Sequence, residues 1–104
     1  MALPPTLTDE QRQQALQKAA EARRARAEVK EKLKMGSMSL GEVLDLADRD
    51  EVIAKTKVLA ILESVPGIGK VKARKAMLNI GIADTRRIRG LGDRQRAELL
   101  AEFG

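Results

Sequence analysis

Residues 65–73 read Val-Pro-Gly-Ile-Gly-Lys-Val-Lys-Ala and place two glycines between segments whose apolar residues recur at helical spacing. Pro66 ends a helix because it has no backbone N–H and its ring clashes with the preceding turn. Gly67 supplies backbone freedom that a residue with a β-carbon lacks, and Ile68 is placed to fill the space between two helices. The stretch therefore predicts a helix, a tight turn and a second helix that begins at Gly69.

A helix that begins at Gly69 offers an anion-binding site. Its first backbone N–H groups lack partners within the helix, and the helix dipole favours negative charge beside them. Lys70 and Lys72 flank these groups, and Arg74 and Lys75 extend the positive charge onto the next turn. Phosphate contacts of this kind position a protein without reading base sequence. The predicted DNA-binding hairpin comprises Ser64, Val65, Pro66, Gly67, Ile68, Gly69, Lys70, Val71 and Lys72. A structural turn with solvated lysines is the alternative.

A second basic cluster follows, with three arginines within residues 86–89. The Gly-Leu-Gly that comes next repeats the hairpin pattern, and Asp93 is a good N-cap for the last helix. Arginine suits bidentate phosphate binding and insertion into a narrow minor groove. Asp93 stands where Lys70 stands in the first hairpin, so this copy is less favourable to phosphate at its helix start. The predicted second DNA contact comprises Thr85, Arg86, Arg87, Ile88, Arg89, Gly90, Leu91, Gly92 and Arg94. A solvated charge run is the alternative.

Charge and composition narrow the class of partner. Residues 55–96 carry eleven basic and three acidic side chains, whereas residues 35–54 carry one basic and five acidic, an asymmetry that attracts polyanions. The chain has no cysteine and no histidine, which removes thiolate metal sites and the usual general base. Phe103 is the only aromatic residue, so base stacking of the kind that single-strand binders use has almost no support. We therefore expect a double-stranded nucleic acid held by its backbone, with no cofactor and no metal.

The rest of the chain predicts an all-α fold without a sheet. A capping box at Thr8 starts a long helix that runs to about Lys34, and its sparse apolar residues predict an arm that docks only at its C-terminal part. A second capping box at Ser39 starts a short helix that ends near Asp48. Asp50 caps a third helix that we expect to run to about residue 64. The basic side chains Arg23, Arg24 and Arg26 on the long helix are either a solvated face or a secondary DNA contact.

No apolar run is long enough to span a bilayer, and the N-terminus lacks a basic stretch followed by an apolar core. We therefore expect a cytoplasmic protein. The length of 104 residues predicts one small domain, residues 35–104, preceded by the arm and long helix of residues 1–34. Pro4 and Pro5 predict an irregular lead-in to that helix.

Three blocks of the chain resemble the actinobacterial integration host factor family: ALPPTLTDEQRQQALQKAAEARRARAEVKEKLK, VLAILESVPGIGKVKA and TRRIRGLGDRQRAELLAEFG. The resemblance implies a long N-terminal helix packed on a helix-two-turns-helix domain, about five helices in all. It implies a nucleoid-associated protein that binds duplex DNA with little sequence preference, bends or compacts it, and assists site-specific recombination. We expect this protein to be monomeric. The family's DNA-contacting hairpin would fall on residues 64–71 and its lid on residues 82–94. The N-terminal arm would be a second DNA surface.

Three other functions fit parts of the pattern. A repair enzyme with such a hairpin would need a base-flipping pocket or an acidic metal cluster, and this chain has too little core for the former and no sign of the latter. A helix at a membrane surface needs a stronger apolar face than the alanines of residues 11–34 provide. A ribosomal or other structured-RNA-binding role remains open, because a hairpin that binds the phosphate backbone serves RNA as well as DNA.

Overall fold

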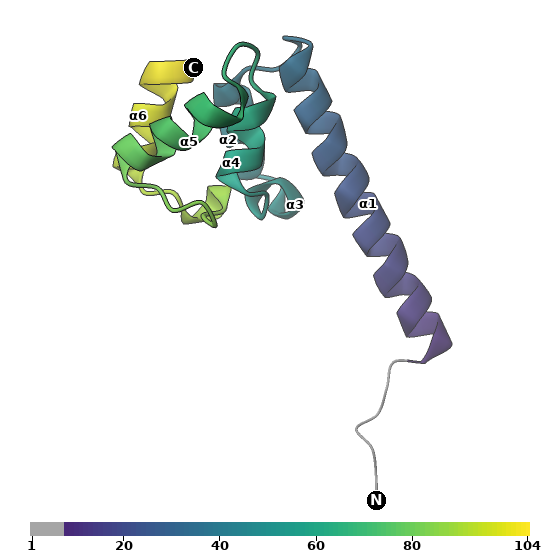
Figure 1. Ribbon diagram of the computed structural model, residues 1–104. Helices are drawn as coiled ribbons and strands as arrows, with labels where there is room; N and C mark the ends of the chain where they lie inside the picture. The colour runs from purple at the N-terminus through teal and green to yellow at the C-terminus, as the bar shows by residue number, and fades with distance from the viewer. Residues whose placement is uncertain (1–7) are drawn as a thin grey trace, which may run out of the picture.

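The computed structural model describes residues 8–104, and the lead-in predicted for residues 1–7 lies outside this range. Helices account for the regular structure, as expected, and the described residues form no sheet. The elements are α1 (Asp9–Lys34), α2 (Leu40–Ala47), α3 (Glu51–Ala54), α4 (Val58–Ser64), α5 (Gly69–Ile80), the 3₁₀ helix η1 (Ile88–Gly90) and α6 (Asp93–Phe103) (Figure 1). Residues 8–104 thus contain six α-helices, against the expectation of about five helices.

The helix α1 is a projecting arm. The Thr8 side chain accepts a hydrogen bond from the Gln11 backbone at 3.1 Å, and the Gln11 side chain accepts one from the Thr8 backbone at 3.0 Å, which completes the predicted capping box. Only Val29 and Leu33 of α1 are buried, while Leu16 is 63% exposed. The radius of gyration is 16.5 Å, against about 13 Å for a compact chain of this length. The N-terminal part of α1 therefore extends away from the other helices (Figure 1).

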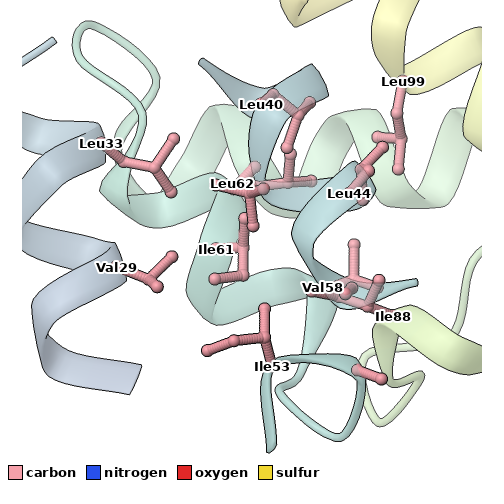
Figure 2. Packing of buried hydrophobic residues seen from close by; sticks show 14 of the residues in the cluster. Val29, Leu33, Leu40, Leu44, Ile53, Val58, Ile61, Leu62, Ile88 and Leu99 are labelled. Atoms are coloured by element: carbon pink, nitrogen blue, oxygen red, sulfur yellow. The ribbon is translucent and has the colours of Figure 1, made fainter. Parts of the chain in front are cut away.

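The core forms around α4, whose Val58, Ile61 and Leu62 are almost completely buried. Figure 2 shows Val29 and Leu33 of α1 facing Ile61 and Leu62. Each such side chain contributes about 1.5–3 kcal/mol when it is removed from water. The other large side chains of the cluster come from every remaining helical segment and include Leu40, Leu44, Ile53, Met77, Ile88 and Leu99. Because both predicted DNA-binding segments adjoin α4 in space, this core determines their relative position.

The third helix is not continuous, contrary to the prediction of one helix from Asp50 to about residue 64. Asp50 caps α3 as expected, by accepting a hydrogen bond from Val52 N at 3.0 Å, but α3 ends after four residues and α4 begins at Val58. The helix is interrupted because its backbone forms hydrogen bonds with the segment that contains Arg86 and Ile88. Ile88 N donates to the carbonyl of Thr56 and Val58 N donates to the carbonyl of Arg86, both at 3.0 Å. Backbone bonds to a distant segment thus replace helical bonds at this point.

The N-cap of the last helix lies one residue earlier in the sequence than expected. Gly92, not Asp93, is the N-cap of α6, and its N–H donates to the side chain of Gln95 at 3.0 Å. Asp93 is the first helical residue, where an acidic side chain favours the helix dipole. None of the helices among residues 8–104 combines the length and the apolar composition that crossing a membrane requires.

Candidate nucleic-acid interface

The hairpin between α4 and α5 has the predicted form. Val65 ends α4 with an extended backbone, and Ile68 N donates to the Val65 carbonyl at 3.3 Å across the turn. Gly67 has φ +82° and Gly69 has φ +68°, so both lie in the left-handed region that residues with a β-carbon rarely adopt. The two glycines are therefore required by the backbone of the turn itself.

The start of α5 is open to solvent. A β-carbon placed on Gly69 would meet no other atom within 4 Å, and no side chain caps the helix. The first N–H groups of this 12-residue helix therefore face outward beside Lys70 and Lys72, which are both exposed. None of the ion pairs formed by the described residues includes either lysine. The arrangement offers unpaired donors and positive charge to an incoming anion.

The predicted hairpin residues divide into an inner and an outer group. Ser64 is buried, and its hydroxyl donates to the Ala60 carbonyl at 3.0 Å, so this side chain serves the fold. Val65 and Ile68 are half-buried and pack against the core. The exposed members are Pro66, Gly67, Gly69, Lys70, Val71 and Lys72.

The second cluster is attached to the chain that enters α4. Lys57 and Arg87 form an isolated antiparallel bridge, flanked by the backbone bonds that join Thr56 to Ile88 and Val58 to Arg86. The Ile88 side chain is buried beside Val58 (Figure 2). The cluster thus lies at the start of α4 and the hairpin at its end. With seven residues, α4 separates the two by about 10 Å.

The arginines of the cluster differ in how they are held. Arg86 is half-buried, and its Nη1 donates to the Gly90 carbonyl at 2.6 Å. The Arg86 side chain fills the space beside Gly90, where an added β-carbon would lie 2.8 Å from its Cδ. Arg87 is exposed, and its Nη1 donates to the Lys55 carbonyl. No ion pair within the described chain includes Arg86, Arg87 or Arg89.

The remaining members of this cluster are placed as follows. Thr85 and Arg89 are exposed, Leu91 is half-buried, and exposed Arg94 pairs with Glu98 at 3.7 Å within α6. The expected repeat of the hairpin is wrong in its local geometry. Gly92 has φ −74° and Gly90 is not among the glycines with positive φ, and a 3₁₀ turn rather than an α-helix precedes Leu91. The segment is therefore an extended stretch with one isolated bridge, followed by a short 3₁₀ turn, and it is held by the core.

The arginines of α1 separate into two groups. Arg23 and Arg24 are exposed, whereas Arg26 is half-buried and lines a groove with Lys30, Lys57 and Arg87. Lys30 and Lys57 were not predicted. The spacing of four residues from Arg26 could have placed Lys30 on the same helix face. Nothing in the sequence placed Lys57 there, because we expected it inside a continuous helix.

The acidic residues between positions 42 and 51 form an acidic belt, of which Asp48 and Glu51 are paired with basic side chains. Asp48 accepts two hydrogen bonds from Arg96, which lower the pKa of that carboxyl. A hydrogen bond from Lys55 likewise lowers the pKa of Glu51. Within residues 8–104 no three histidine, cysteine, aspartate or glutamate side chains come together in a way that could hold a metal ion.

The chain is similar over most or all of its length to proteins of one kind. Residues 33–103 match the family of S13-like H2TH domains, in which H2TH denotes a helix-two-turns-helix fold. The integration host factor of Mycobacterium tuberculosis is 61% identical over 100% of this chain and 98% of its own length. That of Streptomyces coelicolor is 57% identical over 100% of this chain and 96% of its own. The solved structure of sIHF bound to an 8-bp palindromic DNA superimposes with a TM-score of 0.82 and 53% identity, and covers 85% of this chain and 99% of that one.

Proposed function

The chain belongs to the actinobacterial integration host factor family, and we propose from that premise that it is a nucleoid-associated protein that binds double-stranded DNA with little dependence on sequence. The observation that carries the proposal is the hairpin. Two glycines with positive φ expose the N-terminus of α5, and two unpaired lysines stand beside it. A site made of backbone N–H groups and lysines contacts phosphate and has nothing with which to distinguish bases.

The arginine cluster is the second contact in this proposal. Its backbone forms hydrogen bonds with the chain at the start of α4, and the hairpin follows directly from the end of the same helix. A single short helix thus holds both elements, so one duplex contacts them together without rearrangement of the core. Arg87, Arg89 and Arg94 are the exposed arginines of the cluster. They bind the phosphate backbone or enter the minor groove, where arginine is favoured by the negative potential.

The exposed arginines of α1 give the arm a secondary role. Arg23 and Arg24 lie exposed on the projecting helix and do not line the groove that Arg26 lines. They contact a second duplex or a distant part of the same one. The division of the chain into an arm, residues 1–34, and a DNA-binding domain, residues 35–104, follows from this separation of roles. The protein works as a monomer in the nucleoid of the cytoplasm, without a cofactor, and bends or compacts DNA during chromosome organisation and site-specific recombination.

Duplex binding measured against salt concentration tests the proposal. A protein that neutralises about five to seven phosphates gives a slope of log K against log salt near −5 or −6. We expect that slope for several duplexes of unrelated sequence, with similar affinities, and we expect a structured RNA to compete poorly. Efficient displacement by the RNA, or a flat salt dependence, would instead assign the chain to structured RNA. A duplex with donor and acceptor fluorophores at its ends then reports bending as a shorter end-to-end distance.

A further inference from the structure

The groove between α1 and the chain that joins α3 to α4 collects positive charge from three parts of the sequence. Arg26 and Lys30 come from α1, Lys57 precedes α4, and Arg87 comes from the arginine cluster. The other two lining residues are Thr56 and Ala60, so no acidic side chain borders the groove. None of the four cations takes part in an ion pair with another described residue. Four positively charged side chains therefore share one groove that no acidic side chain lines.

The bridge between Lys57 and Arg87 brings two of these positive charges especially close together. Residues opposite each other across an antiparallel pair have their side chains close together, and like charges in these positions are destabilising. Arg87 is also restrained, because its Nη1 donates to the Lys55 carbonyl. The fold thus holds two cations side by side where two neutral residues would be more stable. An anion bound between Lys57 and Arg87 would attract both side chains and so offset their mutual repulsion.

Arg26 provides an independent observation. Its Nε is buried and has no hydrogen-bond partner, whereas buried polar atoms in folded proteins are nearly always paired. Arg23 and Arg24, on the preceding turn, are exposed and have no such constraint. Arg26 therefore brings an unsatisfied hydrogen-bond donor to the lining of this groove, and guanidinium donors bond most strongly to negatively charged acceptors.

We propose that this groove, lined by Arg26, Lys30, Lys57 and Arg87, is a binding site for a phosphate group. Its volume of about 230 Å³ is below the roughly 300–1,000 Å³ of pockets that enclose a whole small-molecule ligand, so the groove is large enough for a phosphate group but does not enclose a whole nucleotide. Lys30 and Ala60 also line the adjacent pocket, which reaches Gly69 and Lys70 of the hairpin and which Glu31 and Glu63 line as well. The groove therefore lies between the arginine cluster and the hairpin, and the carboxylates beyond it confine the anion to the groove itself. A DNA strand bound by both elements supplies the phosphate, which rests on the proposed function; free phosphate is the other source.

The first arm of the test needs no DNA. Inorganic phosphate is added to the full-length protein at constant ionic strength, and the backbone amide resonances are followed by nuclear magnetic resonance. We expect saturable shifts at Lys57 and Arg87, and loss of these shifts in Lys57→Gln. The second arm measures duplex affinity against salt for Lys30→Gln and Lys57→Gln. Lys32→Gln is the matched control, because Lys32 lies on the same helix and pairs with Glu28 outside the groove.

Loss of one phosphate contact lowers the salt slope by about 0.9. Phosphate shifts together with a reduced slope in Lys30→Gln and Lys57→Gln, but not in Lys32→Gln, would support the site with DNA as its ligand. Phosphate shifts with unchanged slopes would support a site for free phosphate. The absence of both effects, or an equal slope loss in Lys32→Gln, would overturn the proposal. Failure of the unaltered protein to bind duplex would overturn the proposed function alone, since the first arm still tests the groove.

Discussion

Arg96 of α6 and Asp48 at the end of α2 form a bidentate ion pair, with Nη1 to Oδ1 at 3.0 Å and Nη2 to Oδ2 at 2.9 Å. Arg96 also lies 3.5 Å from Asp45. The pair joins the C-terminal helix to the acidic belt, 48 residues away in sequence. One of the eleven basic residues in the second half of the chain is thereby committed to the fold and withdrawn from the DNA-binding surface.

This ion pair predicts a dependence of stability on pH. The hydrogen bond from Arg96 lowers the pKa of Asp48, so the folded state binds this proton less tightly than the unfolded state. The pair stabilises the protein above the ordinary carboxyl pKa of about 4, and the contribution is lost as pH falls through the lowered value. Glu51, paired with Lys55, acts in the same direction. In thermal unfolding at pH 7 and pH 3, Asp48→Asn should lose less stability on acidification than the unaltered protein.

Glu102→Gln is the control for that experiment, because Glu102 makes none of the ion pairs found among the described residues. Its acid dependence should match that of the unaltered protein. An Asp48→Asn variant that is as acid-sensitive as the control would show that the ion pair contributes nothing.

Gly69→Ala should weaken both the turn and DNA binding. The backbone φ of +68° costs a residue with a β-carbon about 1–2 kcal/mol, although no neighbouring atom clashes. The variant relieves this strain by shifting the start of α5, and the shift displaces the N–H groups from the phosphate. A bulkier residue should impair binding further while circular dichroism shows nearly unchanged helical content. Gly41→Ala in α2 is the control, because its β-carbon would make ordinary contact with Leu100 at 3.5 Å.

Removal of single cations should separate binding from stability. Lys70→Ala and Arg89→Ala remove exposed side chains for which the described residues show no ion pair. Each should weaken binding about equally on all duplexes and lower the salt slope by roughly one unit, with an unchanged melting temperature. Arg87→Ala should do the same, and its melting temperature should also change little, because the variant loses the bond to the Lys55 carbonyl and is relieved of the like charge opposite Lys57. Sequence-dependent losses would contradict recognition through the backbone.

Ile88→Ala should loosen the arginine cluster from α4. Ile88 is 4% exposed and packs beside Val58, and truncation of such a side chain costs about 2–5 kcal/mol. We expect a lower urea midpoint and faster hydrogen exchange at the amides of Val58 and Ile88, whose bonds tie the two segments together. Leu78→Ala, at a site 80% exposed, should leave both unchanged. Normal exchange at these amides in Ile88→Ala would mean that the backbone bonds alone hold the cluster.

Local features were predicted where the chemistry is local. The caps at Thr8, Ser39 and Asp50 each depend on a side chain that reaches a backbone group two or three residues away, and such bonds are specified by short sequences. The hairpin turn follows in the same way from Pro66 and its two glycines. The starts of these helices and the hairpin turn were therefore predicted nearly at the correct residues, and the family resemblance agreed with the hairpin.

The predictions that failed concern contacts between distant residues. A helix from Asp50 to residue 64 satisfies every local preference, yet the chain at Arg86 and Ile88 bonds to it and divides it. The Gly-Leu-Gly of the second cluster matches the hairpin in sequence. Its backbone conformation is instead determined by the burial of Ile88 and by the Gln95 side chain, which accepts a hydrogen bond from the N-cap residue Gly92.

The sequence by itself thus determined an all-α chain, the hairpin and a basic second half, because capping, glycine conformation and charge depend on neighbouring residues. Only the tertiary structure decided which cations share a surface. It separated Arg26 from Arg23 and Arg24, brought Lys57 opposite Arg87 across a bridge, and assigned Arg96 to the acidic belt. The physical reason is that these placements follow from packing around α4 and from backbone hydrogen bonds between segments about 30 residues apart, which no local pattern encodes.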